Sequence, residues 1–198
     1  MWRGSAPLVL DSTSAARRLL LEGAGLQVET QSPGVDERSV ETTGLAPPDV
    51  ARRLAAQKAV AVSRLHPNRL VLGADQTLAC QGRLFHKPPD RTAAQGQLMA
   101  LSGRTHLLHS AFALAQDGVV ADAAVEDARL TMRQLSADAV DAYLDVVGDT
   151  ALQSVGAYQV EGMGIHLFER IEGNHSTILG LPLTPLLAAL RRMGLLSI

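Results

Sequence analysis

Two apolar runs that each end in an aspartate constrain the fold of this 198-residue chain more than any other feature. The first, PLVLD at residues 7–11, leads into a hydroxyl-rich turn and then into AARRLLLEGAG, which is typical of a short helix that stops at glycine. The second, LVLGAD at residues 70–75, repeats this form, and its acid is expected at the carboxyl end of a strand, where α/β folds bind ligands. The pattern predicts an α/β fold.

Two long alternating segments predict an antiparallel hairpin in the same fold. THLLHSAFALA and GVVADAAVEDARLTMR meet at Gln116-Asp117-Gly118, and an Asp-Gly pair is a strong turn signal. Other predicted strands are Leu26–Thr30, QGRLF and GIHLFERI. Helices are predicted for the segment from Pro48, residues 90–101, residues 136–146 and LPLTPLLAALRRMG. Residues 148–164 are predicted to be a loop. Because no repeat or linker divides the chain, we predict a single domain over residues 1–198, built as one compact unit or as two lobes.

Composition narrows the functional classes. A net charge of −2 provides no general field that would attract nucleic acid or an anionic membrane, and 3% aromatic residues offer few platforms for stacked bases. The single cysteine, Cys80, cannot form an internal disulfide, and the first apolar run is too short for a signal peptide or a spanning helix. We therefore expect a cytoplasmic protein without nucleic-acid or membrane partners.

The stretch from Asp11 to Arg17 allows more than one kind of chemistry. An aspartyl-phosphate enzyme needs a second carboxylate two residues after its nucleophile, and Thr13 stands there instead. A phosphate cradle would use Ser12 or Ser14 with Arg17 at a helix N-terminus, where backbone N–H groups attract anions. The same residues also suit a plain helix cap with Arg17 in solvent, so both interpretations stay open.

Three further residues extend the phosphate interpretation. Lys58, Asp75 and Lys87 are two amines and an acid on different predicted elements, and together they suit the binding of a polyphosphate and the activation of water. Each alone has a simpler interpretation, since Lys58 could lie on a solvated helix face and Asp75 could cap a turn.

Eight short motifs in a fixed order carry a resemblance to a known family. They are LDSTSAARR from residue 10, VDE at 35–37, LAAQKA at 54–59, GADQ at 73–76, HKP at 86–88, SGRT at 102–105, FERIEG at 168–173 and GLPL at 180–183. Residues 8–183 resemble the Maf (septum-formation protein) family of nucleoside triphosphate pyrophosphatases, whose signature opens with Leu-Ala-Ser-x-Ser-Pro-Arg-Arg. The resemblance implies an α/β, Maf/ITPase-like two-lobed fold with a central curved mixed sheet, a cleft between the lobes, and a homodimer.

The same resemblance implies an activity and the residues that perform it. The family hydrolyses a nucleoside triphosphate to the monophosphate and pyrophosphate with a divalent metal, Mg²⁺ or Mn²⁺. Asp75 matches the general base of the family. Asp75 and Glu37 also match candidate metal ligands. The residues matched to phosphate binding are Ser12, Ser14, Arg17, Lys58 and Lys87.

Three positions bear on substrate choice. Ala16 stands where the dTTP/UTP branch has arginine and where the 7-methyl-GTP branch usually has tryptophan. Gln76 and Glu161 resemble the 7-methyl-GTP branch, which also accepts pyrimidine triphosphates. Two of the three positions thus favour that branch. The alternative function, suggested by the arginine missing at Ala16, is a nucleotide-binding regulator of division or septation with little turnover.

Overall fold

The computed structural model describes residues 2–31 and 40–198. The chain divides into two compact units: unit 1 comprises Met1–Gln76, Ser110–Glu126 and Gly180–Ile198, and unit 2 comprises Thr77–His109 and Asp127–Leu179. The single domain predicted over residues 1–198 stays a prediction, and each unit is described by itself below.

In the described residues seven strands form one mixed sheet, in the order β2-β1-β3-β5-β6-β7 with β4 paired to β3. The strands are β1 Leu8–Asp11, β2 Val28–Gln31, β3 Val71–Cys80, β4 Arg83–Phe85, β5 Thr105–Gln116, β6 Val119–Met132 and β7 Phe168–Glu172. The α-helices are α1 Ala15–Gly23, α2 Pro47–Ser63, α3 Arg91–Leu101, α4 Ala137–Val147, α5 His175–Ile178 and α6 Leu183–Arg192. Short 3₁₀ helices are η2 Gly148–Gln153, η3 Val155–Ala157 and η4 Met163–Leu167. The predicted α/β class with a mixed sheet is confirmed.

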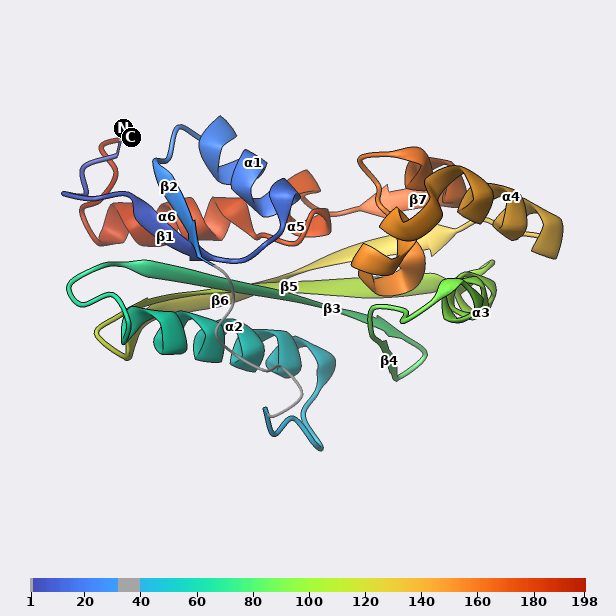
Figure 1. The fold of residues 1–198 in the computed structure, drawn as a ribbon, viewed down its shortest axis with the longest axis horizontal. Helices are drawn as coiled ribbons and strands as arrows, with labels where there is room; N and C mark the ends of the chain where they lie inside the picture. The colour runs from blue at the N-terminus through green and yellow to red at the C-terminus, as the bar shows by residue number, and fades with distance from the viewer. Residues whose placement is uncertain (1, 32–39) are drawn as a thin grey trace. The chain divides into compact units, whose positions relative to one another are not determined.

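Unit 1 is built on the parallel trio β2-β1-β3, with α1 and α6 on one face of the sheet and α2 on the other (Figure 1). Aliphatic side chains fill the α1 and α6 face, among them Leu10, Leu72 and Leu186, which are all fully buried. Burial of such leucines stabilises a fold by about 2 kcal/mol each. This face therefore supplies much of the unit's stability.

The α2 face of unit 1 is packed with small residues. Alanines of α2, including Ala55 and Ala59, contact alanines of β5. At Gly73 of β3 an added Cβ would meet the carbonyl oxygen of Ala55 and would lie 2.6 Å from the backbone N of Ala59. The helix therefore approaches the strand so closely that only glycine fits at position 73.

Unit 2 has its own core around a cluster of three rings. His106 Nε2 lies 2.6 Å from the Tyr158 hydroxyl, and the Tyr158 and Phe168 rings meet edge to face with centroids 4.8 Å apart. His106 is 1% exposed, and burial lowers its pKa from 6.5 to about 4. The imidazole is therefore neutral at physiological pH.

Two predictions about the elements need correction. Asp75 was expected at the end of a strand, but β3 continues to Cys80, because Leu78 to Cys80 pair with β4 and keep the backbone extended. The loop predicted over residues 148–164 contains three short 3₁₀ helices, and η4 extends to Leu167, so that β7 begins only at Phe168. These turns are stabilised by local i to i+3 contacts, which leave no periodic apolar pattern in the sequence.

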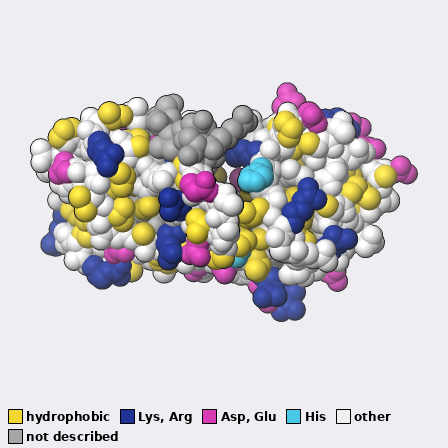
Figure 2. All heavy atoms as spheres, turned by 90° about the horizontal axis from the view of Figure 1, so that it is seen from below, with side chains coloured by type: hydrophobic (Ala, Val, Ile, Leu, Met, Phe, Trp, Pro, Cys, Tyr) yellow, Lys and Arg dark blue, Asp and Glu magenta, His cyan; other side chains and the backbone are white. Residues whose placement is uncertain are grey.

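The surface agrees with the small net charge. Figure 2 shows acidic and basic side chains interspersed with apolar ones over the face in view. Within residues 2–31 and 40–198, no helix combines the length and the apolar character that crossing a membrane requires.

Candidate active site

The centre of the candidate site is a buried ion pair between α2 and β3. Lys58 Nζ donates a 2.6 Å hydrogen bond to Asp75 Oδ1, and the two residues are only 4% and 7% exposed. The interpretation of Lys58 as a solvated helix residue is therefore wrong, because the face of α2 that bears it packs on the sheet. In such surroundings a charge–charge interaction is stronger than in water. The ammonium thus fixes the direction of the carboxylate.

The turn between β1 and α1 forms the second part of the site. Ser14 is the N-cap of α1, and its hydroxyl oxygen accepts a 3.3 Å hydrogen bond from the backbone N–H of Arg17. Ser12, which is 5% exposed, accepts through its hydroxyl oxygen from the backbone N–H of Ser14 at 3.1 Å. The capping interpretation of Ser14 is confirmed, and the cap aligns the first N–H groups of a nine-residue helix.

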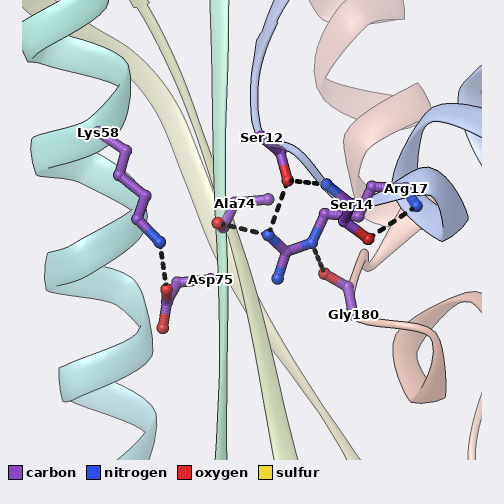
Figure 3. A network of polar contacts seen from close by, with 7 residues as sticks. All are labelled: Ser12, Ser14, Arg17, Lys58, Ala74, Asp75 and Gly180. Atoms are coloured by element: carbon purple, nitrogen blue, oxygen red, sulfur yellow. Dashed lines mark hydrogen bonds and ion pairs between the residues drawn. The ribbon is translucent and has the colours of Figure 1, made fainter. Parts of the chain in front are cut away.

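Arg17 reaches from α1 across unit 1 to two other segments (Figure 3). Its Nε donates to the carbonyl oxygen of Gly180 at 2.9 Å, and Nη1 donates to the carbonyl oxygen of Ala74 at 2.9 Å and to Ser12 Oγ at 3.3 Å. The interpretation that places Arg17 in solvent is wrong. Unit 1 thus brings Arg17 to the residue that directly precedes Asp75.

Two of the specificity positions also lie in unit 1. Gln76 follows Asp75 on β3, and its amide Nε2 donates a 2.9 Å hydrogen bond to Ser110 Oγ. Because side chains alternate along a strand, Gln76 projects to the face opposite that of Asp75, which is the face on which Arg17 lies. Ala16 is in the first turn of α1 and is partly buried.

The remaining predicted residues lie elsewhere. Lys87 is exposed in the segment after β4, and Glu161 is exposed in the turn before η4, so both belong to unit 2. Glu37 lies outside the described residues. The roles assigned to these three residues stay predictions.

Comparisons with known proteins assign this chain to a family. A family model described as "Maf-like protein" matches residues 7–193. The chain belongs to this family. A relative from Nitrobacter winogradskyi named "Nucleoside triphosphate pyrophosphatase" is 56% identical over 200 residues, covering 100% of this chain and 99% of the relative. A relative from Brucella abortus biovar 1 named "7-methyl-GTP pyrophosphatase" is 51% identical over 189 residues, covering 93% of this chain and 95% of the relative.

A solved structure also matches. Its title is "Crystal structure of Nucleoside-triphosphatase / dITP/XTP pyrophosphatase from Mycobacterium abscessus"; it is 18% identical, with 94% of this chain and 97% of that chain covered and a TM-score of 0.46.

The motifs in the sequence did not predict that Asp11 would lie near the candidate site of this Maf-like chain. It is 1% exposed and lies in register with Gly73, so its side chain projects to the α2 face, like that of Asp75 two residues beyond Gly73. The Maf signature has alanine at this position. The acid that stands in place of this alanine is the sequence signal that marks the position. Gly180, whose carbonyl oxygen binds Arg17, was also missed, although it opens the GLPL motif.

The donor set suits a hard divalent cation. Carboxylate oxygens are the ligands that Mg²⁺ prefers, and it usually takes one or two of them together with substrate phosphates. Asp75 supplies such oxygens on the α2 face, and Asp11 is a second carboxylate on that face. Within the part of the chain that the structure describes, no group of three or more His, Cys, Asp or Glu residues could hold a metal.

Proposed function

We propose that this Maf-like protein is a nucleoside triphosphate pyrophosphatase, a hydrolase that converts a nucleoside triphosphate to the monophosphate and pyrophosphate. The observation that carries the proposal is the buried Lys58–Asp75 pair, linked through the Ala74 carbonyl and Arg17 to the capped α1, in a chain 56% identical over its whole length to a relative of that name. A carboxylate held in a fixed direction by a neighbouring ammonium is suited to orient an attacking water and to receive its proton. A capped helix N-terminus is suited to bind phosphate oxygens.

The chemical step follows from these positions. Water attacks the α-phosphorus, the new P–O bond forms, and the bond from that phosphorus to the oxygen bridging to the β-phosphate breaks, releasing pyrophosphate. Asp75 orients the water and takes its proton, while Lys58 holds the carboxylate in place. Negative charge grows on the equatorial and leaving oxygens, and the backbone N–H groups in the first turn of α1 would offset it. Lys87 has the same role in the family resemblance.

The proposal includes a divalent cation, Mg²⁺ or Mn²⁺. Asp75 and Glu37 are the proposed ligands, as in the family pattern. When bound, the cation would offset the negative charge that develops on the phosphate oxygens.

The proposed substrate class is the set accepted by the 7-methyl-GTP branch, either 7-methyl-GTP or pyrimidine triphosphates. Gln76, held by Ser110, and Glu161 support this choice, and so does the 51% identity to the Brucella abortus relative. Ala16 leaves more room beside the first turn of α1 than the arginine or tryptophan of the two branches would. The carboxylate of Glu161 is suited to accept from an exocyclic amino group of a base.

The decisive experiment is a pyrophosphate-release assay on a panel of triphosphates, run with wild type, Asp75→Asn and Asp145→Asn. We expect Asp75→Asn to lose about 10²- to 10⁴-fold in turnover, the usual contribution of a positioned base. Asp145→Asn makes the same chemical change at an exposed carboxylate on α4 and should leave turnover unchanged. Circular dichroism verifies that each variant is folded.

The panel also tests the alternatives. If UTP and dTTP outpace 7-methyl-GTP by tenfold, the branch assignment is wrong. Nucleotide binding without pyrophosphate release with Mg²⁺, Mn²⁺ or Co²⁺ would instead establish the nucleotide-binding regulator of division. The homodimer, the cytoplasmic location and the lack of nucleic-acid and membrane partners stay predictions from the sequence.

A further inference from the structure

The guanidinium of Arg17 is directed at oxygens of the protein itself. Nε and Nη1 donate to the carbonyl oxygens of Gly180 and Ala74, both at 2.9 Å, and Nη1 also donates to Ser12 Oγ at 3.3 Å. Figure 3 shows the planar group lying between these three segments. A guanidinium has five N–H donors in a fixed fork. Three of its contacts here hold the backbone and the β1–α1 turn.

The Ala74 contact acts directly on the candidate base. The carbonyl of Ala74 belongs to the peptide plane that joins Ala74 to Asp75, so holding this oxygen restrains the position of the Asp75 Cα, which bears the carboxylate side chain. The parallel pairing of β3 with β1 ends where Asp11 faces Gly73. Arg17 therefore supplies a donor to β3 one residue beyond the end of its pairing with β1.

Gly180 has the properties needed for the second contact. Its φ is +94°, and a Cβ added there would lie 3.3 Å from both Nε and Nη2 of Arg17. A side chain at this position would therefore press on the guanidinium, whereas glycine lets the carbonyl approach it. The residue that follows, Leu181, is fully buried in the core of unit 1. The burial of Leu181 thus helps to hold the Gly180 carbonyl in the position where it accepts from Arg17.

We propose that Arg17 is a positioning residue, which fixes the backbone at Asp75 and acts on turnover through that carboxylate. The proposal rests on the proposed pyrophosphatase function, and it differs from the phosphate-binding role that the family resemblance implies. Lysine cannot replace arginine here, because one ammonium lacks the planar fork that reaches two carbonyl oxygens at once. A phosphate contact, in contrast, would keep part of its strength with lysine.

The test compares Arg17→Lys, Gly180→Ala and Arg18→Lys in steady-state assays. Arg18→Lys is the matched control, because Arg18 is exposed on the same helix and its Nε lies 3.6 Å from Glu22 Oε1. Displacement of a catalytic group by about 1 Å can cost about 10²-fold. We expect kcat to fall about 10²-fold in both Arg17→Lys and Gly180→Ala, with KM changed less than threefold, and we expect Arg18→Lys to match wild type.

Gly180→Ala is informative because it disturbs the contact and leaves the positive charge in place. Its folding is checked by thermal unfolding, and its binding by titration with a non-hydrolysable α,β-methylene triphosphate, which should bind as to wild type. A tenfold rise in KM for Arg17→Lys, with Gly180→Ala unaffected, would overturn the positioning role and assign Arg17 to phosphate binding. A wild type that releases no pyrophosphate would overturn the proposed function itself, and the positioning role with it.

Discussion

Acidification should destabilise this protein through His106, a residue outside the candidate site. The unfolded chain binds a proton at histidine near pH 6.5, whereas burial lowers the pKa of His106 in the fold to about 4. Between these two values the unfolded state holds the proton and the folded state does not, so stability is complete above pH 6.5 and falls as the pH drops toward 4. Each pH unit of acidification in this window lowers the free energy of unfolding by about 1.4 kcal/mol, and the whole window lowers it by about 3 kcal/mol.

The geometry around the ring explains why protonation is resisted. Nε2 contacts the Tyr158 hydroxyl at 2.6 Å, while Nδ1 is buried and has no hydrogen-bond partner among the described residues. A protonated ring would bear an N–H at Nδ1 with no acceptor in a site that is 1% exposed. Such a buried charge carries a large desolvation penalty.

The assay is urea unfolding at pH 7, 5.5 and 4.5, followed by far-ultraviolet circular dichroism. His106→Gln retains a polar partner for Tyr158 and removes the titration, and His166→Gln is the control at an exposed histidine. From pH 7 to 4.5 wild type should lose between about 2 and 3 kcal/mol more than His106→Gln, and His166→Gln should follow wild type. Carboxylates that titrate in this range contribute equally to all three proteins and cancel. Equal losses in wild type and His106→Gln, or an imidazole NMR titration that places His106 near pH 6.5, would refute the reasoning.

Two further perturbations test the packing of α2 on the sheet. Gly73→Ala should destabilise unit 1 by about 1–3 kcal/mol, because the new Cβ meets the backbone of Ala55 and Ala59. An unchanged melting temperature in a thermal unfolding scan would contradict the close approach of α2 to β3. Lys58→Met should lower the free energy of unfolding, measured by chemical denaturation, by about 3–5 kcal/mol, because it leaves the Asp75 carboxylate buried without its ion-pair partner. The double variant Lys58→Met, Asp75→Leu should regain most of that loss, and strictly additive effects would show that the two side chains are not coupled.

Local patterns in the sequence were sufficient for most of the elements. The alternation that predicts β5 and β6 and the Asp-Gly turn between them are confirmed, as are the helix starts at Ser14 and at Pro48 to within a residue. Such features depend on the pleat of a strand, the donors at a helix end and the conformations open to glycine, all of which act within a few residues. The family motifs GADQ and LAAQKA likewise contain Asp75 and Lys58, which the structure joins in an ion pair.

The tertiary structure alone decided how those residues are held. A periodic pattern shows that one face of α2 is buried, but not that Lys58 on that face meets Asp75 of β3. The two carbonyl oxygens that bind Arg17 lie 57 and 163 residues away in the chain. Backbone carbonyls are chemically alike in every residue, so no side-chain signal marks the two that Arg17 reaches. Only the path of the folded chain brings them within hydrogen-bonding distance of one guanidinium.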